Sequence, residues 1–126
     1  MKTLSKALLG AAVILPGTAI AQQVENGYPV GSLAVAAIER QDWATAERLL
    51  TENKRLKRSD PARLLNLARV YLATGRTSEA VAAWKQVLAS RRDEQVATAS
   101  GKMASTAAIA RYAISRYGNE VQTAAR

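Results

Sequence analysis

LLNLARVY at residues 64–71 and AVAAW at residues 80–84 are the two stretches that decide the fold of this chain. Apolar or small residues recur in both at spacings of three and four, which is typical of the buried stripe of an amphipathic helix. Asp60 and Pro61 precede the first stretch and form a strong helix start, while Gly75 between the stretches favours a left-handed helix end. The sequence therefore predicts two helices joined by a tight turn, with Thr77 as the cap of the second.

A related pattern occurs earlier in the chain. DWATAERLL at residues 42–50 is similar to the surroundings of Ala80, and Ala46 lies 34 residues before that alanine. Self-similarity at this period indicates stacked copies of one helix-turn-helix unit. The chain therefore contains two copies of the unit, and Asp42 is the predicted cap of the second helix of the first copy.

The spacing of the second copy resembles that of the tetratricopeptide repeat family, in which a large-x2-Leu-small-x2-aromatic pattern is followed by Ala-x3-aromatic. The matching residues are Leu64, Leu67, Ala68, Tyr71, Ala80 and Trp84. The resemblance covers roughly residues 31–90, and the first copy departs from it at Ala37 and Gln41, where the second has Tyr71 and Gly75. It implies antiparallel helix pairs in which Tyr71 and Trp84 pack between the helices and Trp43 stays partly exposed.

The resemblance also implies a binding groove, because the first helix of each pair lines a concave surface in this family. The matched outward positions are Leu65, Asn66, Arg69 and Leu72, with Val35 and Ile38 from the first copy. An asparagine at this position in peptide-binding members bonds a ligand's backbone or terminal carboxylate, and Arg69 adds a cation able to bind a carboxylate. Carboxylate-capturing members use three repeats and this chain offers two, so pairing of Arg69 with a surface acid stays open.

The first 21 residues have the layout of a secretory signal peptide. Lys2 and Lys6 precede an apolar run from Ala7 to Leu15, and small residues Ala19-Ile20-Ala21 follow. A membrane-spanning helix needs about 20 apolar residues, roughly twice this run. The sequence therefore predicts export of a bacterial protein to the periplasm or the exterior after cleavage at about Ala21, with a flexible arm at residues 22–31 and no transmembrane segment in the mature chain.

The chain carries a formal net charge of +8. Such a charge favours binding to anionic lipid, envelope polymers or acidic proteins, and nucleic acid is not expected as a partner of an exported chain. A basic patch lies between the two copies. It is interpreted either as a docking site or as a solvated helix end, and its residues are Lys54, Arg55, Lys57 and Arg58.

Residues 91–126 do not continue the repeat. Val96, Thr98 and Ser100-Gly101 suggest a short β-hairpin near residues 95–104 as the alternative to an irregular loop. A last helix is predicted from Ser105 or Thr106 to Tyr117, ended by Gly118 and followed by a polar tail from residue 121. Its apolar stripe would cap the repeat stack, and it comprises Met103, Ala107, Ala110, Ile114 and Tyr117.

Histidine and cysteine are both absent, and the ten acidic residues are scattered along polar faces. The chain therefore lacks the commonest general base, thiol nucleophiles and the zinc sites that these ligands build. We therefore expect a mainly α-helical protein with about two repeats and a capping helix, and no enzyme, cofactor or metal. The predicted function is an exported scaffold or adaptor that binds a protein or peptide through the groove. A basic protein adsorbed to anionic surfaces is the alternative, and self-association stays open.

Overall fold

The computed structural model describes residues 28, 31–97 and 102–126 of the chain. The predicted signal peptide, most of the predicted arm and the Ser100-Gly101 turn lie outside these residues. The described chain is mainly helical, as predicted, with one two-stranded hairpin. Its elements follow the order α3 (Val35–Glu39), α4 (Trp43–Glu52), α5 (Pro61–Ala73), α6 (Thr77–Ala89), β1 (Gln95–Ala97), β2 (Met103–Ser105) and α7 (Thr106–Ala124).

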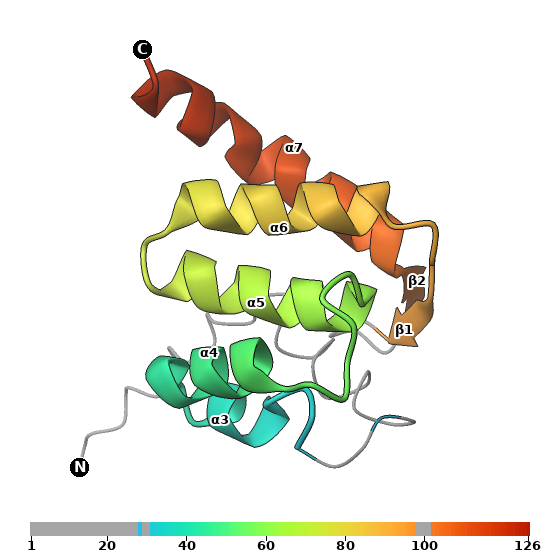
Figure 1. The fold of residues 1–126 in the computed structure, drawn as a ribbon. Coiled ribbons are helices and arrows are strands. Elements are labelled where there is room, and N and C mark those ends of the chain that lie inside the picture. Colours follow the sequence, from blue (N-terminus) through green and yellow to red (C-terminus); the bar gives the residue numbers. More distant parts are fainter. Residues whose placement is uncertain (1–27, 29–30, 98–101) are drawn as a thin grey trace, which may run out of the picture.

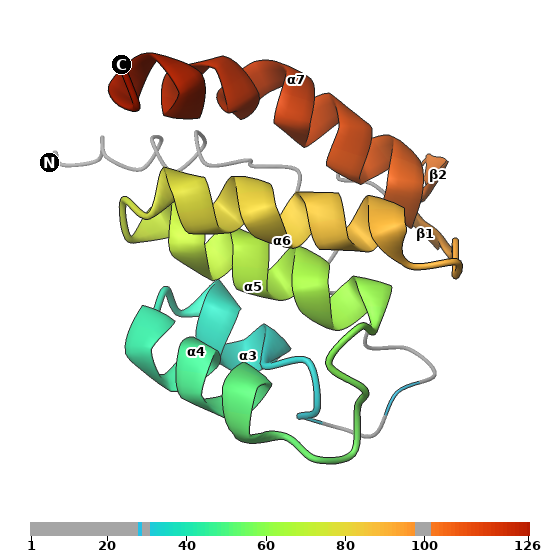
Figure 2. The same cartoon turned by 45° about the horizontal axis from the view of Figure 1, so that its top comes forward.

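The helices stack in three layers (Figures 1 and 2). The pair α3 and α4 forms one end, α5 and α6 form the middle, and α7 lies across α6 at the other end. The two pairs are the two predicted repeats, and α7 packs mainly against α6. Each layer buries its apolar side chains against the next, as expected of a repeat stack.

Helix α5 is the centre of the core. Every residue from Pro61 to Val70 is buried, including the polar Arg63 and Asn66. On α6, Ala80 is fully buried and Trp84 is 6% exposed, so both occupy the packing positions that the sequence predicts. Tyr71 is only partly buried. It lies near the end of α5, and the guanidinium of Arg76 lies over its ring, 4.8 Å from the centroid.

Both repeats turn in the same way. At the end of α5 the Arg76 amide donates to the Tyr71 carbonyl at 2.7 Å, and Gly75 has a left-handed φ of 79°. At the end of α3 the Asp42 amide donates to the Ala37 carbonyl at 2.9 Å, and Gln41 has a φ of 58°. Hydrogen bonds of this span around a left-handed residue define a Schellman turn.

The second helices of the two repeats begin differently. Asp42 caps α4 as predicted, since its carboxylate accepts a hydrogen bond from the Thr45 amide at 3.2 Å. The sequence also predicts Thr77 as the cap of α6, and this prediction is wrong: Thr77 is the first helical residue, and the N-cap Arg76 makes no side-chain cap bond. The Arg76 side chain instead binds the carboxylate of Glu47 on α4, with Nη1 3.1 Å from Oε2.

The predicted hairpin is confirmed, with Val96 opposite Ala104 in an antiparallel pair. It leads directly into α7, whose start is held by two caps. The Ser105 hydroxyl accepts from the Ala108 amide at 2.9 Å, and the Asp93 carboxylate accepts from the Ala107 amide at 3.1 Å. The hydrogen bond from the Ala107 amide lowers the pKa of Asp93, and side-chain bonds from Thr106 and Ser105 lower it further.

The predicted end of the last helix is wrong. Helix α7 continues through Gly118 to Ala124, so the polar tail is helical as well. Tyr117 stacks on Trp84 with ring centroids 5.7 Å apart, and Val121 packs against the core, so contacts on both sides of Gly118 favour the helix. Met103 does not belong to the helical stripe, because it lies in β2 with 62% of its surface exposed.

Candidate functional site

The four groove residues predicted from the second repeat lie on α5, and the structure buries most of them. Leu65, Asn66 and Arg69 are 4%, 1% and 6% exposed, while Leu72 is partly exposed. Successive helical residues are about 100° apart, so Leu65, Arg69 and Leu72 share one side of the helix and Asn66 lies beside it. The two groove residues predicted from the first repeat lie on α3, where Val35 is 6% and Ile38 is 1% exposed.

Asn66 has an internal partner. Its amide nitrogen Nδ2 donates to the carbonyl of Leu33 at 2.9 Å. Leu33 precedes α3 and is fully buried. The bond therefore joins the second repeat to the start of the first, and it satisfies a polar group that would be costly to bury alone.

Arg69 has no such partner among the described residues. Its Nε and Nη1 atoms are buried and form no hydrogen bond in the described part of the chain. The guanidinium lies over the ring of Trp43, with the ring centroid 5.4 Å away, and burial lowers the pKa of the Arg69 guanidinium. Trp43 remains partly exposed, as predicted, so a partly exposed aromatic ring lies against a buried cation. Leu72 follows Arg69 by three residues on the same side of α5 and is also partly exposed.

The basic patch forms the loop between α4 and α5. Lys54, Arg55, Lys57 and Arg58 are all exposed, and none of these four forms an ion pair with another described residue. The loop is tied down by its neighbours: the Asn53 side chain accepts from the Arg55 amide at 2.8 Å and donates to the Ser32 carbonyl at 2.9 Å. The patch is therefore an accessible cationic surface on a fixed loop.

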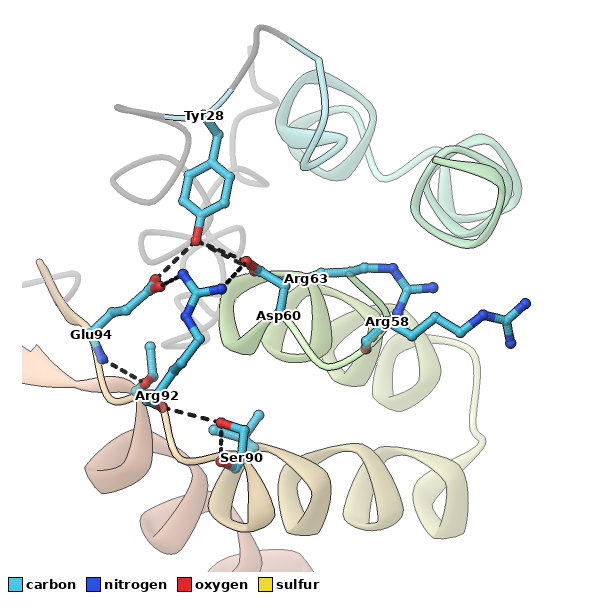
Figure 3. Close-up of polar contacts among 9 residues, drawn as sticks. Tyr28, Arg58, Asp60, Arg63, Ser90, Arg92 and Glu94 are labelled. Atoms are coloured by element: carbon cyan, nitrogen blue, oxygen red, sulfur yellow. Dashed lines mark hydrogen bonds and ion pairs between the residues drawn. The ribbon is translucent and has the colours of Figure 1, made fainter. Parts of the chain in front are cut away.

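A polar cluster that sequence reasoning missed lies where the hairpin meets α5 (Figure 3). The Tyr28 hydroxyl donates to Glu94 at 2.9 Å and also lies 3.3 Å from the Asp60 carboxylate. Arg92 pairs with both acids, at 3.6 Å from Asp60. Burial and the bond to Glu94 raise the pKa of Tyr28. Asp60 carried a signal in the sequence as a helix cap, but the contacts of Tyr28 with Glu94 and of Arg92 with Asp60 join residues far apart in the chain.

Each carboxylate of the cluster forms contacts that stabilise the fold. Asp60 is 3% exposed, and its Oδ1 accepts the Arg63 amide at 3.1 Å at the start of α5. Glu94 is occupied by Tyr28 and Arg92. Within the described residues, no group of three or more acidic, histidine or cysteine side chains is placed to hold a metal ion. Nor does any described helix have the length and apolar character needed to cross a membrane.

Comparison with known proteins agrees with the fold. The family profile described as "Tetratricopeptide repeat" matches residues 37–103, more than half of the chain. The chain therefore belongs to the tetratricopeptide repeat family, whose members are typically non-catalytic and bind other proteins. The match ends at Met103, just before α7. Neither the curated proteins nor the solved structures compared with the chain match it.

Proposed function

We propose that this protein is a non-enzymatic adaptor, exported to the cell envelope, that binds an anionic segment of a partner protein beside Arg69. The observation that carries the proposal is the buried Arg69 guanidinium, two of whose donor atoms form no hydrogen bond with the residues that the structure describes. An arginine keeps its charge at any physiological pH, and an uncompensated buried charge is costly. A partner's carboxylate that reaches either atom would supply a missing acceptor in a charge-assisted hydrogen bond.

The surroundings of Arg69 suit a segment that combines an acid with apolar residues. Trp43 offers a partly exposed aromatic face and Leu72 a partly exposed aliphatic one. Asn66 is bonded to Leu33, so it is not needed for capture and serves to hold the first repeat in place. The proposed site is thus narrower than the groove predicted from the sequence, with Arg69 as its polar centre and Leu65 as buried support.

Crosslinking and pull-down from the native envelope test the proposal. Arg69→Glu should abolish capture of the partner, whereas Arg69→Met, which keeps most of the buried volume, should weaken it roughly tenfold or more by removing a charge-assisted bond. Arg111→Glu on the exposed side of α7 makes the same change in net charge and should have no effect. Full capture by a folded Arg69→Glu variant would refute the site.

A second candidate function is adsorption to anionic lipid or envelope polymer through the basic patch. It is favoured by the exposure of all four cations of the patch and by their lack of ion pairs within the described chain. Attachment of this kind weakens steeply as ionic strength rises, whereas an apolar contact does not. Neutralising the four cations should release the protein if this mode dominates, and should leave capture at Arg69 intact if it does not.

Export is tested separately by the intact mass of the protein recovered outside the cytoplasm. Cleavage after Ala21 should remove the first 21 residues. A product that still begins at Met1 would refute both the signal peptide and the cleavage site, and would leave the binding site at Arg69 unaffected.

A further inference from the structure

The side of α5 opposite to Arg69 forms a hollow between α4 and α6. Its volume is about 390 Å³, within the range of roughly 300–1,000 Å³ typical of small-molecule sites. Its lining includes none of the groove residues, and from α5 it comprises Arg63, Leu64, Leu67 and Tyr71. The hollow is therefore independent of the site proposed at Arg69.

One end of the hollow is cationic. Arg63 is 7% exposed, and its Nε donates to the Leu50 carbonyl at 2.8 Å while Nη1 donates to the Arg58 carbonyl at 3.1 Å. These two bonds hold the guanidinium plane, and Nη2 has no hydrogen-bond partner among the described residues. Arg58 lines the same hollow. Burial and the neighbouring Arg58 charge lower the pKa of the Arg63 guanidinium, so an anion here would relieve an unfavourable environment.

The floor is apolar. Leu64 and Leu67 are 3% and 4% exposed, and Ala83 of α6 is 4% exposed beside them. The remaining charged lining residue is Glu79, which lies 3.6 Å from the Arg76 guanidinium. A compact dianion such as phosphate would leave the apolar floor uncovered and would be repelled by Glu79. A monoanion with a short apolar body would pair with the cationic end of the hollow and cover its apolar floor.

We propose that this hollow is a binding site for a small organic carboxylate. The carboxylate lies against the guanidinium groups of Arg63 and Arg58, and the aliphatic body of the ligand covers Leu64 and Leu67. The protein would then carry a small-molecule site on one side of α5 and a protein-binding site on the other.

Titration of the full-length chain with hexanoate, followed by amide chemical shifts in NMR spectra, tests this proposal. Saturable shifts are expected at Leu64, Leu67 and Ala83. The uncharged probe 1-hexanol should bind at least roughly tenfold more weakly, because it forms no charge-assisted bond. Equal binding of the two probes, or hexanoate shifts gathered around Trp43 and Arg69, would overturn the proposal.

Gln86 allows a charge to be placed in the hollow without disturbing the core, because it lines the hollow and is exposed on α6. Gln86→Glu should weaken hexanoate binding roughly fivefold, and Gln86→Lys should strengthen it. Lys85→Glu is the matched control: this neighbour is also exposed but does not line the hollow, so binding should be unchanged although the net charge falls further. Equal weakening by Lys85→Glu and Gln86→Glu would show non-specific attraction and refute the site.

Discussion

The two repeats differ in what they contain and agree in how they turn. Helix α3 has 5 residues and α5 has 13, yet both end in a Schellman turn around a left-handed residue, Gln41 in one and Gly75 in the other. Glycine adopts this conformation without steric cost, whereas other residues do so at a cost of about 1–2 kcal/mol. The comparison teaches that the turn geometry is held by its hydrogen bonds and by the packing of the stack, even where the residue disfavours it.

The largest expected effect comes from the aromatic anchor of the second repeat. Trp84→Ala should lower the free energy of unfolding by about 3–5 kcal/mol, because the ring is buried and also stacks on Tyr117 of α7. Leu50 occupies the equivalent position of the first repeat and is fully buried, so Leu50→Ala should cost about 2–5 kcal/mol. Urea unfolding measured by circular dichroism gives both values. A cost for Leu50→Ala near zero would mean that the first repeat contributes little to the fold.

The paired alanines provide the next test. Ala46 and Ala80 are both fully buried where the helices approach closely. Replacing either with leucine should overpack the contact and cost about 1–3 kcal/mol. If Ala80→Leu is destabilised and Ala46→Leu melts like the wild type, the two repeats are not equivalent. If both variants melt like the wild type, the 34-residue match is accidental.

Substitutions at the two left-handed residues, Gln41 and Gly75, should change the stability in opposite directions. Gln41→Gly should stabilise the protein and Gly75→Gln should destabilise it, each by about 1 kcal/mol, because the φ angles of 58° and 79° favour glycine. A Cβ atom at Gly75 meets nothing within 4 Å, so the change tests backbone conformation without a steric clash. A destabilised Gln41→Gly variant would show that the glutamine side chain, and not strain, dominates at the first turn.

The smallest effect concerns α7, which belongs to neither repeat. Gly118→Ala should stabilise the protein by about 0.5–1 kcal/mol, since glycine in a helix interior is unfavourable relative to alanine. The added Cβ would lie 3.5 Å from the Ile114 side chain, an ordinary contact. Thermal unfolding measures the change. Destabilisation would indicate that the helix needs its glycine for packing at this point.

The sequence predicted the features that depend on neighbouring residues. The Asp42 cap, the Asp60-Pro61 helix start and the Gly75 turn are each local, and all three are found where expected. The hairpin also agrees, with β1 and β2 paired as predicted. The repeat period added what local signals lack, namely which helices pair and which alanines lie between them.

The remaining features depend on contacts between distant residues. Gly118 signals a helix end, but Tyr117 and Val121 pack on α6 and the core and carry the helix onward. Arg69 lies at a position where the resemblance implies an outward side chain, yet the structure buries it. Tyr28 meets Glu94 across 66 positions of sequence, and no periodicity reports such a bond. Binding at Leu65, Asn66, Arg69 and Leu72 stays a prediction.

Arg76 affects which parts of the protein unfold together. In repeat proteins, stability is divided between individual units and the interfaces of nearest neighbours. Arg76 belongs to an interface, because its guanidinium covers Tyr71 of its own repeat and binds Glu47 of the preceding one. The first repeat, whose α3 has 5 residues, therefore depends on its contact with the second repeat to stay folded. Amide hydrogens of α4 should accordingly exchange with solvent in the same cooperative event as those at the end of α5, and Arg76→Ala should uncouple the two.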